Sequence, residues 1–123
     1  MKKAVWGLVA LLLIGGLVWL IRTPGKPGKL DSFATCLKDS GALFYGAFWC
    51  PHCQNQKAMF GSSAKNLPYI ECSTADGAGQ LQTCVDAGVT GYPTWKFPDG
   101  TVETGEVALE RLSELTSCQL PQE

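Results

Sequence analysis

Cys50 and Cys53 have two residues between them, a spacing that lets the two sulfurs form a disulfide with each other. An apolar run, residues 42–49, leads into the pair, and a stretch compatible with a helix, residues 54–60, follows it. This order predicts a buried strand that ends in a turn, with the cysteines in the first turn of a helix. A helix N-terminus carries partial positive charge and unpaired N–H groups, which stabilise a thiolate. We therefore predict that Cys50, the more exposed sulfur, is the nucleophile and that Cys53 resolves the mixed disulfide.

A cysteine pair at this spacing also occurs as half of a zinc site or as a structural crosslink. A zinc site would need two more well-spaced ligands, and the one histidine of the chain, His52, already lies inside the motif. The position at a strand-to-helix junction favours redox chemistry, and we predict neither a metal nor another cofactor. A module that binds copper or zinc through Cys50, Cys53 and His52 stays as an alternative from a different functional class.

Pro51 and His52, between the two cysteines, are predicted to set the redox balance of the pair. An imidazole beside the start of a helix can give a hydrogen bond or a positive charge to the Cys50 thiolate, which stabilises the reduced form. A stabilised reduced form makes the disulfide a stronger oxidant. The alternative for His52 is an exposed turn residue without a tuning role.

The chain of 123 residues has room for one small domain, because its N-terminal part is a separate apolar segment. Residues 1–29 contain five Lys and Arg and no acid, whereas residues 30–123 contain five Lys and Arg against eleven Asp and Glu. The acidic charge of the second part argues against nucleic acid as a partner. Six cysteines in so short a chain, behind an export-type segment, indicate an oxidising compartment.

Residues 4–21 contain no charged or strongly polar side chain and follow a short basic N-terminus, residues 1–3. As a helix this segment would be about 27 Å long, enough to cross the hydrocarbon core of a bilayer. A cleaved signal peptide has a similar pattern, but this run is long for one and no Ala-x-Ala-like site follows it. We predict a transmembrane anchor at 4–21. Basic residues on both sides leave the orientation open, and the cysteines favour an extracytoplasmic domain.

Two Pro-Gly steps mark residues 22–30 as a linker, which leaves residues 31–123 for the folded domain. Asp31 or Ser32 is expected to cap the first helix. The pattern then predicts strands and helices in the order strand–helix–strand–helix–strand–strand–helix. The expected elements are a helix that closes near Gly41, a strand at 42–48, a helix at 51–60, a strand at 67–72, a helix with Leu81, Cys84 and Val85 on its apolar face that stops at Gly88, a hairpin of 94–97 and 101–104, and a final helix with Ala108, Leu109, Leu112 and Leu115 on one face.

Two motifs, Phe48-Trp49-Cys50-Pro51-His52-Cys53 and Gly91-Tyr92-Pro93-Thr94, resemble the thioredoxin superfamily. Residues 45–57, 67–72 and 91–95 resemble one subgroup in particular, the thioredoxin-like domain fused to bacterial vitamin K epoxide reductase homologues. The resemblance covers about residues 40–115, and the chain has no counterpart of the four-helix reductase domain. It implies an α/β thioredoxin-like fold of order βαβαββα, a mixed central sheet flanked by helices.

The resemblance also implies roles for residues around the cysteine pair. Pro93 fits the family's cis-proline, which lies against the active-site cysteines and shapes the groove for the substrate chain. Trp49 and Tyr92 are expected to line that groove, with ordinary packing as the alternative for each. The Cys-Pro-His-Cys sequence is shared with the periplasmic oxidant DsbA. Thioredoxin itself has a buried acid where Phe44 stands here, and the loss of that acid favours oxidation over reduction of substrates.

Four cysteines outside the active-site pair remain, and they allow three pairings. Cys72 and Cys84 resemble an extra pair in the reductase-fused subgroup, where they would form a structural or a relay disulfide. The same resemblance leaves Cys36 with Cys118, which would join the first and last helices.

These observations together predict a membrane-anchored, extracytoplasmic thiol–disulfide oxidoreductase. It would oxidise cysteines of exported proteins and be reoxidised by an integral membrane protein resembling the vitamin K epoxide reductase homologues. A reductase or isomerase fed by a membrane electron carrier is the alternative within the same class.

Overall fold

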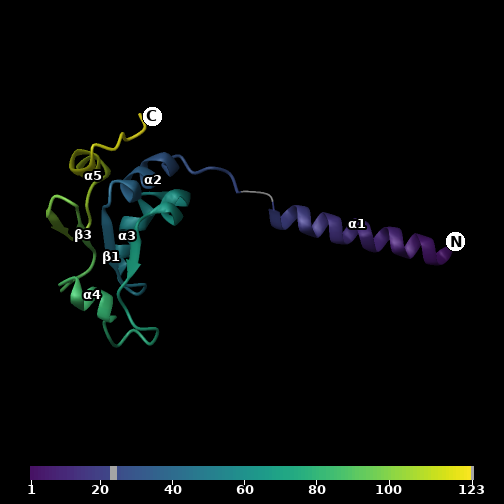
Figure 1. Cartoon of the computed structure of the whole chain (residues 1–123), viewed down its shortest axis with the longest axis horizontal. Helices are drawn as coiled ribbons and strands as arrows, with labels where there is room; N and C mark the ends of the chain where they lie inside the picture. The colour runs from purple at the N-terminus through teal and green to yellow at the C-terminus, as the bar shows by residue number, and fades with distance from the viewer. Residues whose placement is uncertain (23–24, 123) are drawn as a thin grey trace.

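Strand β1 (Leu43–Gly46) lies inside a four-stranded sheet in the computed structural model, which describes residues 1–22 and 25–122. The strand order is β2-β1-β3-β4, with β2 at Tyr69–Glu71, β3 at Thr94–Lys96 and β4 at Val102–Thr104. β1 pairs in parallel with β2 and antiparallel with β3, and β3 pairs antiparallel with β4 (Figure 1). The sheet is therefore mixed, as expected.

Helices flank this sheet and complete the predicted order of elements (Figure 1). After α2, the elements run β1, α3, β2, α4, β3, β4 and α5, with a short 3₁₀ helix between α3 and β2, so the βαβαββα pattern is confirmed. The helices are α2 (Asp31–Asp39), α3 (Pro51–Ala58), η1 (Gly61–Asn66), α4 (Gln82–Asp86) and α5 (Leu109–Thr116).

Phe44 lies at the centre of the main core, because its strand is covered on both sides. It pairs across the sheet with Tyr69 on β2 and with Trp95 on β3. Its ring stacks on Trp95 at a centroid distance of 4.7 Å and meets Tyr69 edge-on at 5.1 Å. Phe33 and Leu37 from α2 belong to the same buried cluster. A second, smaller cluster contains Tyr45, Cys72, Cys84 and Val89.

Three expectations about local structure were wrong. Helix α2 begins at Asp31 with Leu30 as its N-cap and no side-chain cap; the Asp31 carboxylate instead accepts a hydrogen bond from the Gly28 N–H at 2.9 Å. Leu81 and Val85 are 38% and 48% exposed, because α4 is only five residues long and buries Cys84 alone.

The third concerns the apolar run before the cysteines. Phe48 and Trp49 are 48% and 52% exposed, so the run does not stay buried up to the cysteine pair. The pairing of β1 with β3 ends at Tyr45 and that with β2 ends at Gly46, and two residues later the side chains of the chain are exposed. Apolar sequence alone does not show where a strand leaves its sheet.

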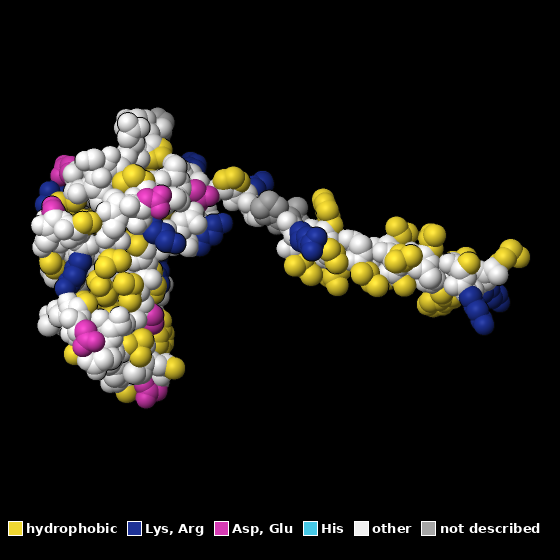
Figure 2. All heavy atoms as spheres, in the orientation of Figure 1, with side chains coloured by type: hydrophobic (Ala, Val, Ile, Leu, Met, Phe, Trp, Pro, Cys, Tyr) yellow, Lys and Arg dark blue, Asp and Glu magenta, His cyan; other side chains and the backbone are white. Residues whose placement is uncertain are grey.

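The N-terminal helix α1 (Lys2–Arg22) contains the predicted anchor segment 4–21 and buries none of its residues. Hydrophobic side chains cover it along its length, and basic side chains gather at its two ends (Figure 2). It is long and apolar enough to cross a membrane, a property that a signal sequence shares. Of the predicted linker 22–30, residues 23 and 24 lie outside the described part of the chain.

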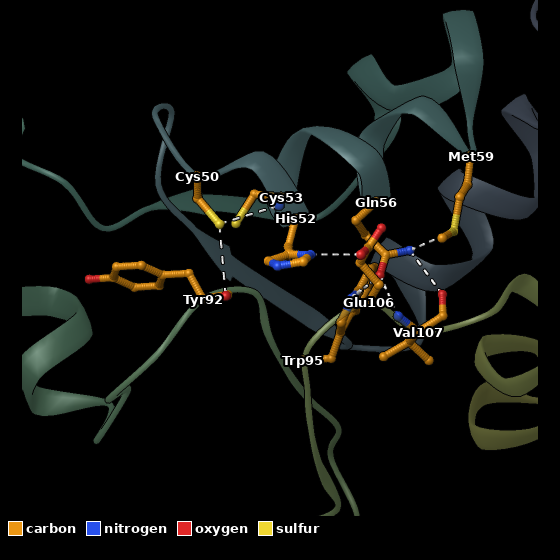
Figure 3. Close-up of polar contacts among 9 residues, drawn as sticks. All are labelled: Cys50, His52, Cys53, Gln56, Met59, Tyr92, Trp95, Glu106 and Val107. Atoms are coloured by element: carbon orange, nitrogen blue, oxygen red, sulfur yellow. Dashed lines mark hydrogen bonds and ion pairs between the residues drawn. The ribbon is translucent and has the colours of Figure 1, made fainter.

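Gln56 is a fully buried polar side chain that ties α3 to the loop before α5 (Figure 3). Its side-chain amide accepts a hydrogen bond from the Val107 N–H at 2.6 Å and donates one to the Val107 carbonyl at 3.0 Å. The indole N–H of Trp95 donates to the same amide oxygen at 3.3 Å. One side chain therefore satisfies three buried polar groups from β3 and the last loop.

We expect Gln56→Leu to lower the free energy of unfolding by about 2–3 kcal/mol, because it leaves buried backbone and indole groups without partners. Equilibrium urea unfolding measures the change. Asn55→Leu, at the neighbouring exposed position, is the control and should change stability by less than about 0.5 kcal/mol. Equal effects of the two substitutions would contradict a role for the Gln56 contacts.

Candidate active site at the N-terminus of helix α3

Cys50 is the N-cap of α3 and Pro51 follows it at the first helical position (Figure 3). Pro51 suits that position because its fixed φ is helical and its missing N–H would have no partner there. The Cys50 sulfur accepts a hydrogen bond from the backbone N–H of Cys53 at a distance of 3.4 Å. The helix thus directs an N–H that has no partner within the helix, and its positive end, at the Cys50 sulfur, which is the arrangement that stabilises a thiolate.

The two cysteines differ in burial. Both are free thiols; Cys50 is 5% exposed, whereas Cys53 is 0% exposed and lies beneath it. Burial, together with the contact with Cys50, raises the pKa of the Cys53 thiol to about 12. Cys53 is therefore protonated at neutral pH and must lose its proton before it can attack another sulfur. The order of attack predicted from sequence, Cys50 first and Cys53 second, fits this difference.

The Tyr92–Pro93 segment faces Cys50 from across the site (Figure 3). The Cys50 thiol lies 3.8 Å from the Tyr92 carbonyl oxygen, to which it donates. The Tyr92–Pro93 peptide bond is cis, the geometry that the resemblance implied. Pro93 itself is fully buried. The fold therefore brings together two motifs that lie more than forty residues apart in the chain.

Phe48 and Trp49, which are half-exposed, and Tyr92, which is partly buried, form an apolar rim in the two segments that adjoin Cys50. The indole of Trp49 meets the Tyr92 ring edge-on, with the two centroids 6.0 Å apart. Its N–H donates to the Ser73 hydroxyl at 2.9 Å, which fixes the half-exposed ring beside the cysteine. Trp49 and Tyr92 thus lie against each other, and the Tyr92 carbonyl adjoins Cys50.

His52 does not contact Cys50, the contact that would allow direct tuning of the thiolate. Its imidazole Nδ1 lies 2.8 Å from the Glu106 carboxylate, and its side chain is 67% exposed (Figure 3). Any effect of His52 on the sulfur therefore acts through space. Sequence analysis missed Glu106, because it lies in the loop between β4 and α5 and no local pattern marks it.

A polar cluster beside the central strand was also missed. Phe44 is fully buried where thioredoxin has its acid, and the neighbouring position on β2 is Tyr69. The Tyr69 hydroxyl donates to the Glu71 carboxylate at 2.8 Å, and the Lys57 ammonium lies 3.4 Å from the Tyr69 ring centroid. The signal available in the sequence was Tyr and Glu at alternate positions of a short strand, which share one face.

Glu71 also fastens the loop that carries the cysteines. Its carboxylate accepts hydrogen bonds from the backbone N–H groups of Phe48, at 3.2 Å, and Ser73, at 2.9 Å. Burial acts to raise the pKa of Glu71, but the hydrogen bonds from Ser73, Tyr69 and Phe48 outweigh it and hold the pKa below its usual range.

A lowered pKa of Glu71 in the folded state means that the ionised form stabilises the protein. This stabilisation is complete above the ordinary carboxyl pKa of about 4.3 and is lost as the pH falls through the lower folded value. We expect the loss to be about 1 kcal/mol or less, after allowance for solvent screening. Urea unfolding between pH 7 and pH 3 measures it. Glu71→Gln should flatten this part of the pH dependence, and an unchanged slope would contradict the assignment.

Disulfides join the remaining four cysteines in the pairs Cys36–Cys118 and Cys72–Cys84, the two pairs that the resemblance implied. The first connects α2 to the second residue after the end of α5. The second connects the end of β2 to α4, and both of its cysteines are 0% exposed. Among residues 1–22 and 25–122, no group of three or more His, Cys, Asp or Glu is arranged to hold a metal.

Comparison with known proteins agrees with this geometry. The thioredoxin family model matches residues 31–117. The chain is 44% identical over 95 residues to the thiol–disulfide oxidoreductase LTO1 of Arabidopsis thaliana, a match that covers 74% of this chain and 25% of that protein. It is 33% identical over 93 residues to protein disulfide isomerase-like 2-2 of Oryza sativa subsp. japonica, covering 67% of this chain and 24% of that protein.

The chain thus spans about a quarter of the length of these two relatives. The matched segment contains the whole sheet, the cysteine pair and the Tyr92–Pro93 bond. A free cysteine pair at the start of α3, facing a cis-proline, is the arrangement that the matched fold uses for thiol–disulfide exchange. The chain belongs to the thioredoxin family of thiol–disulfide oxidoreductases.

Proposed function

We propose that this protein oxidises cysteine pairs in exported proteins through the Cys50–Cys53 disulfide. One observation carries the proposal: the Cys50 sulfur lies at the N-terminus of α3, beside the Tyr92 carbonyl, while the Cys53 sulfur is buried beneath it. The apolar rim of Phe48, Trp49 and Tyr92 would hold the substrate chain. The backbone of Tyr92, next to Pro93, would pair with an extended peptide and so add affinity without strict sequence specificity.

The reaction consists of two exchanges. A substrate thiolate attacks Cys50 in the disulfide, the Cys50–Cys53 bond breaks, and Cys53 leaves as a thiolate and takes up a proton. The second substrate thiolate then attacks the substrate sulfur of the mixed disulfide, and Cys50 leaves as a thiolate. The substrate loses two electrons and the cysteine pair gains them. The positive end of α3 stabilises the Cys50 thiolate, which makes Cys50 a good leaving group.

The direction of electron flow is proposed from Pro51, His52 and Phe44. The Cys-Pro-His-Cys sequence is shared with a strong oxidant, and Phe44 stands where thioredoxin has a buried acid. The reduction potential, measured by equilibration with glutathione buffers and thiol trapping, tests it. A value of roughly −120 to −180 mV supports oxidation, whereas a value near −270 mV would indicate a reductase that needs an electron donor.

His52→Ala should lower the reduction potential by at least about 30 mV, which is a tenfold change in the equilibrium constant. The reason is that His52 lies in the first turn of α3, two residues after Cys50, where a positive charge or a hydrogen-bond donor stabilises the thiolate and so the reduced form. The same glutathione equilibration measures the shift. Asn55→Ala, at an exposed position of the same helix, is the control. An unchanged reduction potential would show that His52 is an exposed residue without a tuning role.

The proposed location is the extracytoplasmic side of a membrane, with α1 as an uncleaved anchor. The apolar helix and the two disulfides outside the active site support it. Expression of the full chain, followed by membrane extraction with alkali and N-terminal sequencing, distinguishes a retained helix from a cleaved signal. Protease added from the extracytoplasmic side should digest an exposed loop of the domain only if the domain lies there.

The proposed partner that reoxidises the pair is an integral membrane protein resembling the vitamin K epoxide reductase homologues, because the related domain is fused to such a protein. If cells that lack this membrane protein keep Cys50 fully oxidised, the proposed partner is wrong.

A copper- or zinc-binding module is the competing function. Protein purified under reducing conditions should then carry about one metal equivalent through gel filtration, whereas the proposed enzyme should not.

A further inference from the structure

The buried position of the Cys53 thiol gives it no direct proton exchange with solvent. The thiol is 0% exposed, yet it must lose a proton to resolve a mixed disulfide and gain one when it leaves. Phe44 occupies the place of the buried acid and carries no titratable group. A route for this proton therefore has to come from other side chains near the sulfur.

The Cys53 sulfur and the Tyr69 side chain both lie next to Gly46. A Cβ atom built on this glycine would lie 3.0 Å from the Cys53 sulfur and 3.4 Å from the Tyr69 hydroxyl oxygen. The Tyr69 ring carbon Cε2 would lie nearer still, at 2.8 Å, so the edge of the Tyr69 ring and the Cys53 sulfur both pack against Gly46, in space that a side chain at residue 46 would need. Tyr69 reaches this space from β2, which pairs in parallel with β1.

The Tyr69 hydroxyl connects this space to the surface. Its hydrogen is donated to the Glu71 carboxylate at 2.8 Å, which leaves the lone pairs of the oxygen free to accept a proton from the interior. Glu71 is partly exposed and is held in place by the backbone N–H groups of Phe48 and Ser73. The sequence of groups from interior to solvent is thus thiol, hydroxyl and carboxylate.

We propose that Tyr69 and Glu71 form the proton route between the buried Cys53 thiol and solvent. The route rests on the proposed roles of the cysteines, with Cys50 as nucleophile and Cys53 as the resolving thiol. It assigns to two residues of β2 the task that the absent buried acid would perform.

The step begins with glutathione attached to Cys50 through a mixed disulfide. The Cys53 proton passes to the Tyr69 oxygen while the Tyr69 hydroxyl proton passes to Glu71. The Cys53 thiolate attacks the Cys50 sulfur, the Cys50–Cys53 bond forms, and the bond to glutathione breaks. The glutathione sulfur leaves with the electron pair and takes a proton from water, and Glu71 releases its proton to solvent. The reverse path protonates Cys53 when it leaves the disulfide.

The electrostatics favour a relay in which Tyr69 stays neutral before and after each transfer. Burial and the bond to Glu71 raise the pKa of Tyr69 far above its usual value, so the hydroxyl does not ionise on its own. The titratable and charged groups around the Cys53 sulfur are Cys50 and Lys57 on α3, with Tyr69 and Glu71 on β2. The Lys57 ammonium offsets the negative charge that moves along this path.

The test separates the two steps of a single oxidation by oxidised glutathione. Reduced full-chain protein is mixed with oxidised glutathione and quenched with acid, and mass spectrometry follows the Cys50–glutathione adduct and its conversion to the disulfide. Tyr69→Phe should slow the second step on the order of 10- to 100-fold and leave the first step unchanged. Glu71→Gln should slow the second step by a larger factor than the first, because Glu71 also holds the loop that carries Phe48. The second step of both variants should also gain a steeper dependence on pH, because hydroxide must replace the lost route.

Two variants serve as controls. Tyr45→Phe makes the same chemical change on the neighbouring strand, in the second cluster, and should behave as wild type. Glu71→Asp keeps a carboxylate and should recover part of the rate that Glu71→Gln loses. If Tyr69→Phe does not fold, Glu71→Gln and Glu71→Asp still decide the outcome. Wild-type rates of the second step in both Tyr69→Phe and Glu71→Gln would overturn the route, whereas absence of any adduct on wild-type Cys50 would overturn the proposed function itself.

Discussion

Cys50→Ala should lower the rate of disulfide exchange by at least about 1,000-fold, because the variant has no nucleophile that a substrate or partner can reach. Cys53, although a thiol, is 0% exposed and cannot take over the first attack. Oxidation of a peptide that contains two reduced cysteines, followed by liquid chromatography, measures the rate. The variant should fold normally, since the Cys50 sulfur accepts only one hydrogen bond from the backbone.

Cys53→Ala distinguishes the two cysteines. This variant keeps the nucleophile and loses the resolving thiol, so it should accumulate a stable mixed disulfide at Cys50 after reaction with a disulfide. The adduct is detected as an increase in mass that a reductant removes. If Cys53→Ala formed no adduct while Cys50→Ala did, the assigned roles would be reversed.

Removal of the Cys36–Cys118 disulfide should lower the free energy of unfolding by about 4 kcal/mol, the largest loss of stability that we expect. The disulfide joins positions 82 residues apart, so it closes a loop that contains nearly the whole domain. Cross-linking so long a loop removes much of the conformational entropy of the unfolded chain. Urea unfolding of Cys36→Ala/Cys118→Ala measures the effect.

The Cys72–Cys84 disulfide is the internal comparison. Its cysteines are 12 residues apart, so Cys72→Ala/Cys84→Ala should lose about 3 kcal/mol, less than the long-range pair. Loss of the Cys72–Cys84 disulfide should disturb the active-site loop more than loss of Cys36–Cys118. The reason is that Glu71 and Ser73, on either side of Cys72, hold Phe48 and Trp49. A larger loss of stability for the short-range pair would contradict the chain-entropy argument.

Apolar periodicity and turn residues were sufficient to predict the order of the strands and helices. Strands β1 and β2 are shorter than predicted, because an apolar run continues past the last paired residue; Phe48 and Trp49 belong to such a run and are exposed. Which side chains α4 buries could not be predicted, because the helix has only five residues and buries Cys84 alone, through its disulfide. Leu81 and Val85 therefore face solvent.

The sequence by itself determined the chemistry of this protein, because two cysteines at a strand-to-helix junction place their sulfurs at a helix N-terminus through local geometry alone. The tertiary structure decided everything that depends on contacts between distant segments. It placed Tyr92 beside Cys50, Glu106 beside His52, and Gln56 against the last loop. These contacts have no local signal, because each joins residues more than forty positions apart that meet only when the sheet and its helices have packed.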